Sequence, residues 1–83
     1  MTTGRTPHRM TLYPFAEVAE NANNSIARGW MVFQQFNCAA CGAKNTVLEE
    51  NVFYTSGKCQ DCHAITDISR DGCNFAMMGG GET

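Results

Sequence analysis

The first regular pattern of apolar residues along the chain predicts one amphipathic helix. Between Pro14 and Arg28, apolar residues recur at helical spacing on one face, which comprises Phe15, Val18, Ala19, Ala22 and Ile26. Proline suits the first position of a helix, and Gly29 is placed to end it. Three asparagines within the segment are weak helix formers. We therefore expect a helix over residues 14–28 that needs the rest of the protein to pack against.

Short β-prone segments follow the predicted helix and indicate a small sheet built from hairpins. They are Trp30–Phe36, Thr46–Leu48, Val52–Thr55 and Ile65–Ile68, and the Asp71-Gly72 turn ends the last of them. No segment approaches the roughly 18 uninterrupted apolar residues of a membrane span, and the start of the chain lacks the apolar core of a secretory signal. We expect a cytoplasmic protein with no membrane contact.

Length and composition favour a single domain with loose ends. The chain has 83 residues, of which 43% are hydrophobic and 17% charged, as in ordinary globular proteins. We predict a flexible N-terminal arm over residues 1–10, a single domain over residues 11–78 and a flexible tail over residues 79–83. A domain this small buries too little surface to be stable through core packing alone, so we expect an additional stabilising cross-link.

The cysteines are the strongest candidates for that cross-link. Four of the five form two C-x-x-C pairs, Cys38/Cys41 and Cys59/Cys62, separated by seventeen residues. This spacing lies in the range of zinc sites, because two tight turns can aim four soft thiolates at one tetrahedral Zn²⁺. Gly42 follows the first pair, where the chain must reverse sharply. We predict one structural zinc ion bound by the four paired cysteines.

Other uses of these residues fit the sequence less well. An odd number of cysteines and the absence of a secretory signal disfavour disulfides. A redox dithiol usually lies at a helix N-terminus, whereas both pairs here lie among β-prone segments. Cys73 is expected to be a small buried residue, and four sulfurs leave no need for His63 as a ligand. His8, in the arm, has no partner in the sequence.

With these motifs the sequence resembles the zinc-ribbon family, in which two cysteine knuckles at the tips of β-hairpins clamp one zinc. The resemblance covers Val32 to about Ile68, and it implies a small α+β fold with Cys38, Cys41, Cys59 and Cys62 as ligands. The segments Phe36–Ala43, Gly57–Cys62 and Thr66–Ile68 further resemble small zinc-ribbon proteins of bacteriophages. Ribbons bind nucleic acids or proteins or serve as scaffolds, so the resemblance does not name a function.

Charge and side-chain chemistry leave two functional hypotheses open. The formal charge is −2, and four thiolates around one Zn²⁺ make it about −4. No nucleophile with a matching base, no phosphate-binding loop and no open metal motif is visible, so we expect neither an enzyme nor a small-molecule substrate. The first hypothesis is a protein-interaction module, such as a phage-encoded adaptor or inhibitor of a host or viral protein.

The second hypothesis is a nucleic-acid-binding ribbon. It rests on the fold class and on four basic residues that a fold can gather on one face: Arg5, Arg9, Lys44 and Lys58. Aromatic residues could stack on bases, although core packing is the better explanation for Phe33, Phe36, Phe53, Tyr54 and Phe75. Because binding to nucleic acid draws on neutralised phosphates, an acidic protein with few cations is poorly suited to it.

Overall fold

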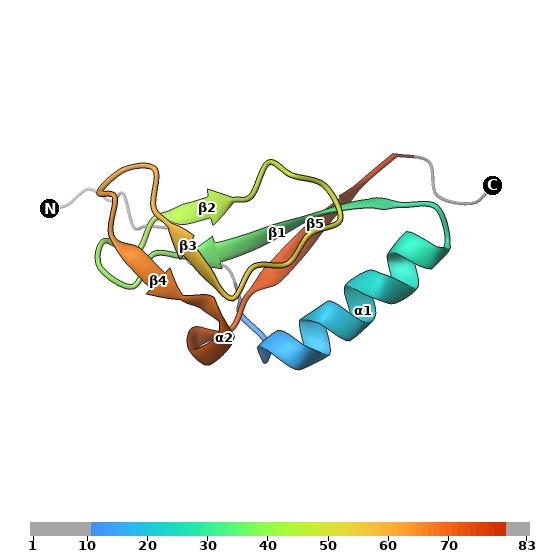
Figure 1. Ribbon diagram of the computed structural model, residues 1–83, viewed down its shortest axis with the longest axis horizontal. Coiled ribbons are helices and arrows are strands. Elements are labelled where there is room, and N and C mark those ends of the chain that lie inside the picture. The colour runs from blue at the N-terminus through green and yellow to red at the C-terminus, as the bar shows by residue number, and fades with distance from the viewer. Residues whose placement is uncertain (1–10, 80–83) are drawn as a thin grey trace, which may run out of the picture.

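Within residues 11–79 the chain forms two small antiparallel sheets and two helices (Figure 1). The structure is a computed structural model that describes residues 11–79. The elements in chain order are α1 (Phe15–Ala27), β1 (Met31–Asn37), β2 (Lys44–Thr46), β3 (Ser56–Lys58), β4 (Ile65–Asp67), α2 (Ile68–Asp71) and β5 (Asn74–Met78). This order gives a small α+β fold, as the sequence predicted.

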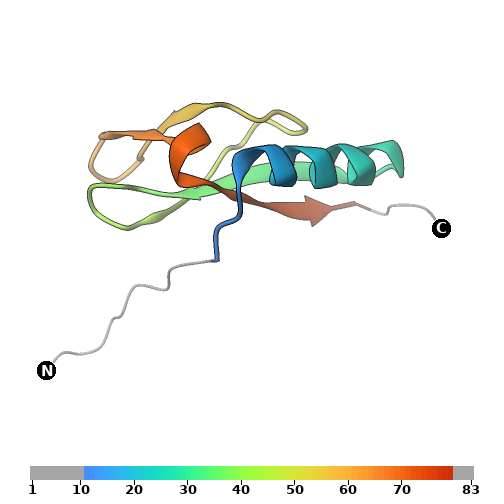
Figure 2. The ribbon, with the colours of Figure 1, turned by 90° about the horizontal axis from the view of Figure 1, so that it is seen from below.

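Strand β1 organises the larger sheet, whose strand order is β2-β1-β5. It pairs antiparallel with β2 through Phe36 and Asn45, and with β5 through Gln34 and Phe75. The smaller sheet is the β3–β4 hairpin, with Gly57 opposite Thr66. In Figure 2 this hairpin, α2 and α1 all lie on the same side of the larger sheet. The core therefore lies between one face of β1 and this covering layer.

Side chains alternate along β1 as a strand with one buried face requires. Val32, Gln34 and Phe36 are buried, whereas the intervening residues are partly exposed. The core cluster consists of Val18, Phe36, Ile68 and Cys73, with Phe15, Val47, Phe53 and Phe75 packed against it. Strand β3 approaches Phe36 so closely that a Cβ atom at Gly57 would lie 2.7 Å from the Phe36 ring. Only a glycine allows this contact between the two sheets.

The predicted helix is confirmed to within one residue at each end. Val18 and Ala22 are its buried residues, and α1 contacts β1, β5 and α2. It ends in a Schellman motif: the N–H of Gly29 donates to Ile26 and that of Trp30 to Ser25, while Gly29 adopts a φ of 99°. The helix packs within its own chain. At 13 residues it is too short to cross a bilayer, and no helix in residues 11–79 has the required length and hydrophobicity.

A loop that connects the two hairpins replaces one predicted strand. Residues 52–55 were expected to form a strand, but they pair with side chains rather than with a backbone ladder. The buried Gln34 amide donates to the Tyr54 carbonyl and accepts from the Tyr54 N–H, both at 2.9 Å. Asn51 likewise accepts from the Val32 N–H and donates its own N–H to the Val32 carbonyl. The Asn51 bonds thus satisfy the backbone of β1 at Val32, and the Gln34 bonds satisfy the backbone of the loop at Tyr54.

Other strand boundaries also differ from the prediction, because pairing geometry overrode β propensity. Strand β2 is Lys44–Thr46 rather than Thr46–Leu48, since pairing starts directly after the first cysteine turn. Ile68 does not end a strand; it begins α2, which Asp67 caps. Strand β5 was not predicted at all, because Asn74–Met78 lacks alternating polar residues. The predicted arm over residues 1–10 and residues 80–83 of the predicted tail lie outside the described residues.

Candidate metal centre

The first cysteine pair lies on a tight turn that follows β1. The Cys38 N–H donates to Ala43 at 2.8 Å, and the Gly42 N–H donates back to the Cys38 carbonyl at 2.9 Å. The N–H groups of Ala40 and Cys41 both lie 3.3 Å from the Cys38 Sγ. Gly42 adopts a φ of 81°, so glycine is placed where the backbone must reverse. This turn matches the knuckle that the sequence predicted.

The second pair repeats the same turn between β3 and β4. The Cys59 N–H donates to Ala64 at 2.9 Å, the His63 N–H donates to the Cys59 carbonyl at 3.0 Å, and the Asp61 N–H lies 3.3 Å from the Cys59 Sγ. His63 takes the place that Gly42 has in the first knuckle, with a φ of 67°. A non-glycine residue pays a steric cost in this left-handed region.

The two knuckles lie at the same end of the molecule (Figure 1), and their sulfurs converge. Sγ atoms of Cys38 and Cys62 are 3.5 Å apart, those of Cys41 and Cys59 are 3.7 Å apart, and all four lie within 4.8 Å of one another. Four sulfurs around a tetrahedral Zn²⁺ at about 2.3 Å would be about 3.8 Å apart. The cluster therefore fits one structural zinc ion held by four thiolates.

This arrangement fits a zinc ribbon. Comparisons with models of protein families, with curated proteins and with solved structures found no match for the chain. The assignment of the ribbon consequently rests on its two hairpins, its paired knuckles and its four-sulfur cluster.

The environment of the sulfurs divides the four thiols into two kinds. The N–H of Cys62, followed by other donors, lowers the pKa of Cys59 to about 6, and the N–H of Cys41 lowers the pKa of Cys38. The Ala43 N–H favours the Cys41 thiolate, yet burial and the neighbouring sulfurs raise the pKa of Cys41 to about 12. Zinc requires all four as thiolates, so its binding must displace protons.

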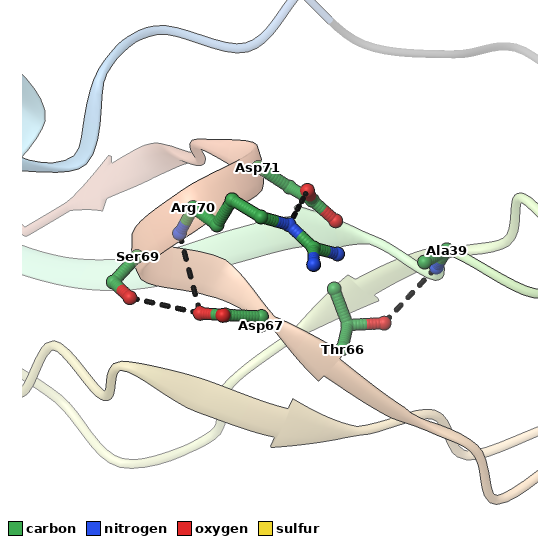
Figure 3. A network of polar contacts seen from close by, with 6 residues as sticks. All are labelled: Ala39, Thr66, Asp67, Ser69, Arg70 and Asp71. Carbon is green, nitrogen blue, oxygen red and sulfur yellow. Dashed lines mark hydrogen bonds and ion pairs between the residues drawn. The ribbon is translucent and has the colours of Figure 1, made fainter.

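Each knuckle is tied to the opposite hairpin by a buried polar side chain. The Ala39 N–H in the first knuckle donates to the Thr66 hydroxyl on β4 at 3.0 Å (Figure 3). The Gln60 N–H in the second knuckle donates to the Asn45 amide oxygen on β2, also at 3.0 Å. Thr66 and Asn45 are both buried. These crossed hydrogen bonds fix the spacing of the knuckles. The sequence carries no distinctive signal for them, because Asn45 and Thr66 each stand next to other polar residues.

A capped helical turn continues the second hairpin into the core. The Asp67 carboxylate accepts from the Ser69 hydroxyl at 2.8 Å and from the Arg70 N–H at 3.2 Å, as Figure 3 shows. The Ser69 hydroxyl, followed by the Arg70 N–H, lowers the pKa of Asp67. The cap starts α2 directly after β4 and so directs Ile68 into the core, where it is fully buried.

None of the remaining candidates within residues 11–79 belongs to the sulfur cluster. Cys73 is buried, as predicted, and its thiol is 3.9 Å from the Gln34 amide nitrogen; burial raises the pKa of Cys73. His63 is exposed and is not part of the metal-type cluster. Lys44 and Lys58 are exposed on β2 and β3, whereas Arg5, His8 and Arg9 lie outside the described residues.

The predicted packing role of the aromatic residues holds for most of them. Phe36 is buried, and the rings of Phe53 and Phe75 meet edge to face with centroids 6.2 Å apart. Phe33 is partly exposed on the opposite face of β1. Tyr54 is 42% exposed, and its hydroxyl contacts the Glu49 carboxylate. Tyr54 is therefore available at the surface, unlike the core rings.

Proposed function

We propose that the protein is a non-catalytic ribbon module whose zinc ion is structural and whose surface binds another protein. Four thiolates fill a tetrahedral zinc ion, so no position is left for an activated water or a substrate. Within residues 11–79 the four cysteines form the only group of metal-ligating side chains of this kind. The metal then serves to hold the two hairpins in place.

The observation that carries this proposal is the grouping of exposed apolar side chains. Leu48 is 78% exposed and lines the same surface groove as Tyr54. Met31 and Met78, also exposed, are directly paired on β1 and β5. Single exposed apolar residues are ordinary on a protein surface, whereas neighbouring ones favour a docking role. Both of these groups lie on the surface of residues 11–79.

Nucleic-acid binding is the second candidate. Lys44 and Lys58 favour it, because both are exposed on strands that adjoin the knuckles. Six lysines and arginines stand against eight aspartates and glutamates in the whole chain, however, and the zinc centre adds further negative charge. Few phosphates could be neutralised by such a molecule.

The resemblance to small zinc-ribbon proteins of bacteriophages extends the proposal to a setting. It suggests an adaptor or inhibitor that acts on a host or viral protein in the bacterial cytoplasm. The exposed apolar groups suit a small protein that docks on a larger one.

The test is capture of partners by the zinc-loaded chain from a bacterial lysate, with and without nuclease, followed by measurement of binding with the purified partner. We expect a protein that remains bound after nuclease and binds directly when purified. A metal-free sample prepared with a chelator is the control. Retention only in the presence of nucleic acid would contradict the proposal and support the second candidate.

A further inference from the structure

A groove of about 410 Å³ runs between β2 and β3, beside the zinc knuckles. The residues that matter for its chemistry are Phe36, Val47, Leu48, Tyr54, Gly57 and Lys58, and we call it the β2–β3 groove. The hydrogen bond from Gln60 to Asn45, two further lining residues, joins the two strands next to the second knuckle. The groove is therefore framed by elements whose spacing the metal centre controls.

The outer edge of β2 offers unpaired backbone groups. Cys38 and Val47 hydrogen-bond across the β1–β2 ladder, with Ala43 and Gln34 respectively. Because bonded and non-bonded pairs alternate in an antiparallel ladder, Asn45 also faces β1, whereas Lys44 and Thr46 direct their N–H and C=O groups away from it. No strand among the described residues pairs with this edge. An added strand could bond there.

Strand β3 presents the same arrangement on the other side of the groove. The bond from Cys59 to Ala64 sets the alternation, so Gly57 faces β4 while Ser56 and Lys58 direct their backbone groups outward. Consecutive residues of both strands line the groove: residues 45–48 and residues 56–58. Lining by consecutive residues means that the groove follows the strand backbones, as an extended segment requires.

Charge indicates which segment would fit. Lys58 is the charged residue among those that line the groove, and Lys44 lies at the start of β2. Within the described part of the chain the only ion pair joins Arg70 and Asp71, so neither lysine is paired there. The groove thus combines an apolar lining with the unpaired positive charge of Lys58, and the Glu49 carboxylate contacts the hydroxyl of Tyr54, another lining residue. The complementary segment carries an apolar residue and one carboxylate that reaches Lys58.

We propose that the β2–β3 groove binds an extended segment of a partner protein, which adds as a strand along β2. One apolar side chain of that segment enters the groove against Phe36 and Leu48, and a carboxylate two residues away, on the same face of the added strand, meets Lys58. This inference rests on the proposed function, because it names the surface and the chemistry through which the module binds its partner.

The test uses random short peptides displayed as a library and selected on the immobilised, zinc-loaded chain. We expect enrichment of peptides in which an aspartate or glutamate lies two residues away from an apolar residue. One selected peptide is then synthesised, and its affinity is measured for the protein and its variants. Shifts in the NMR spectrum on peptide addition should centre on residues 44–48 and 56–58.

Two matched pairs of variants separate groove binding from other effects. Leu48→Ser should weaken peptide binding about tenfold, whereas Ile65→Ser, which removes a similarly exposed apolar residue on β4 outside the groove, should leave it unchanged. Thr46→Pro removes an outward N–H and should abolish strand addition, whereas Thr46→Val keeps that N–H. Zinc content and circular dichroism confirm that each variant is folded.

Each outcome decides the inference. Enriched peptides that lack carboxylates, peptides that bind elsewhere, or no enrichment at all would overturn it. If a short RNA displaced the peptide, the groove would be a nucleic-acid site, and the inference would be wrong. If the chain dimerised through β2 and peptide binding was lost, the groove would be an interface between two copies of the chain, and the inference would again be wrong. A natural partner that binds Leu48→Ser and Thr46→Pro as tightly as the original protein would overturn the groove while leaving the proposed function intact.

Discussion

At the scale of single residues, the two knuckles form the same backbone turn but carry different residues at the position where φ is positive. Gly42 and His63 occupy corresponding places, both with positive φ, although only glycine is free of a Cβ atom there. His63 is exposed and lies outside the sulfur cluster. The sequence indicated this inequality, because His63 stands where the first knuckle has glycine.

Substitution of His63 tests whether its backbone or its imidazole matters. We expect His63→Gly to be more stable than His63→Ala by about 1 kcal/mol, since only alanine keeps a Cβ atom in the left-handed region. Both variants should bind one zinc per chain. Chemical denaturation with metal analysis measures both quantities. Loss of zinc from either variant would instead make the imidazole a ligand.

The five cysteines should fall into two classes when each is replaced. Apparent zinc affinities of roughly 10–16 kcal/mol equal or exceed the roughly 5–15 kcal/mol stability of an ordinary domain. Cys41→Ser and Cys59→Ser should therefore leave a largely unfolded chain with little zinc, as should a strong chelator. Circular dichroism and metal content are the measurements.

Cys73→Ser is the matched control, because Cys73 is buried but lies outside the cluster. A hydroxyl in its place should cost on the order of 1–3 kcal/mol, with zinc content unchanged. If Cys73→Ser lost its zinc while the other two variants kept theirs, the four-cysteine set would be wrong.

At the scale of elements, the side chain of Gln34 makes the hydrogen bonds that a neighbouring strand would otherwise make to the loop at Tyr54. Gln34 is fully buried and makes two hydrogen bonds to the backbone of Tyr54, so it holds the loop before β3 against β1. Phe53 in the same loop packs on Phe75 of β5. The loop thereby connects the core to the edge of the β2–β3 groove, where Tyr54 is exposed.

Replacement of Gln34 should loosen this loop. Gln34→Leu leaves the N–H and C=O of Tyr54 without their partners and should destabilise the protein by about 1–3 kcal/mol per unsatisfied group. Gln35→Leu, its neighbour on the more exposed face of β1, should change stability far less. Hydrogen exchange of the Tyr54 amide, with chemical denaturation, checks this. Equal effects of the two variants would contradict the proposed role.

The sequence predicted elements well where a local signal sets them, and poorly where distant contacts do. Helix α1 has a proline start, a glycine end and a continuous apolar face, and its bounds agree closely. The knuckles follow from the C-x-x-C spacing. Strand β5 depends on pairing with β1, far away in sequence, and residues 52–55 are held by a buried side chain. Neither contact leaves a periodic pattern.

At the scale of the whole molecule, charge separates the two functional candidates. The chain carries a formal charge of −2, and the zinc centre makes it about −4. The exposed Lys44 and Lys58 are few beside the carboxylates of the protein. A protein surface with an acidic segment remains a suitable partner, whereas an extended phosphate backbone does not.

Binding to random DNA or RNA should therefore be weak at physiological salt and should change little with salt concentration. Each neutralised phosphate contributes a slope of about −0.9 in log K against log salt for duplex DNA. Fluorescence anisotropy with labelled oligonucleotides measures the slope. A tight complex that dissociates steeply between low and moderate salt would reveal many phosphate contacts and would favour the nucleic-acid candidate.

The metal ion at the four sulfurs is the most direct test of the structural zinc centre. X-ray absorption at the zinc edge, combined with metal analysis of the purified protein, measures both its ligands and its amount. We predict one zinc per chain, surrounded by four sulfurs at about 2.3 Å. A nitrogen or oxygen ligand in the first shell, or less than one tightly bound metal in a folded chain, would contradict the structural zinc centre formed by Cys38, Cys41, Cys59 and Cys62.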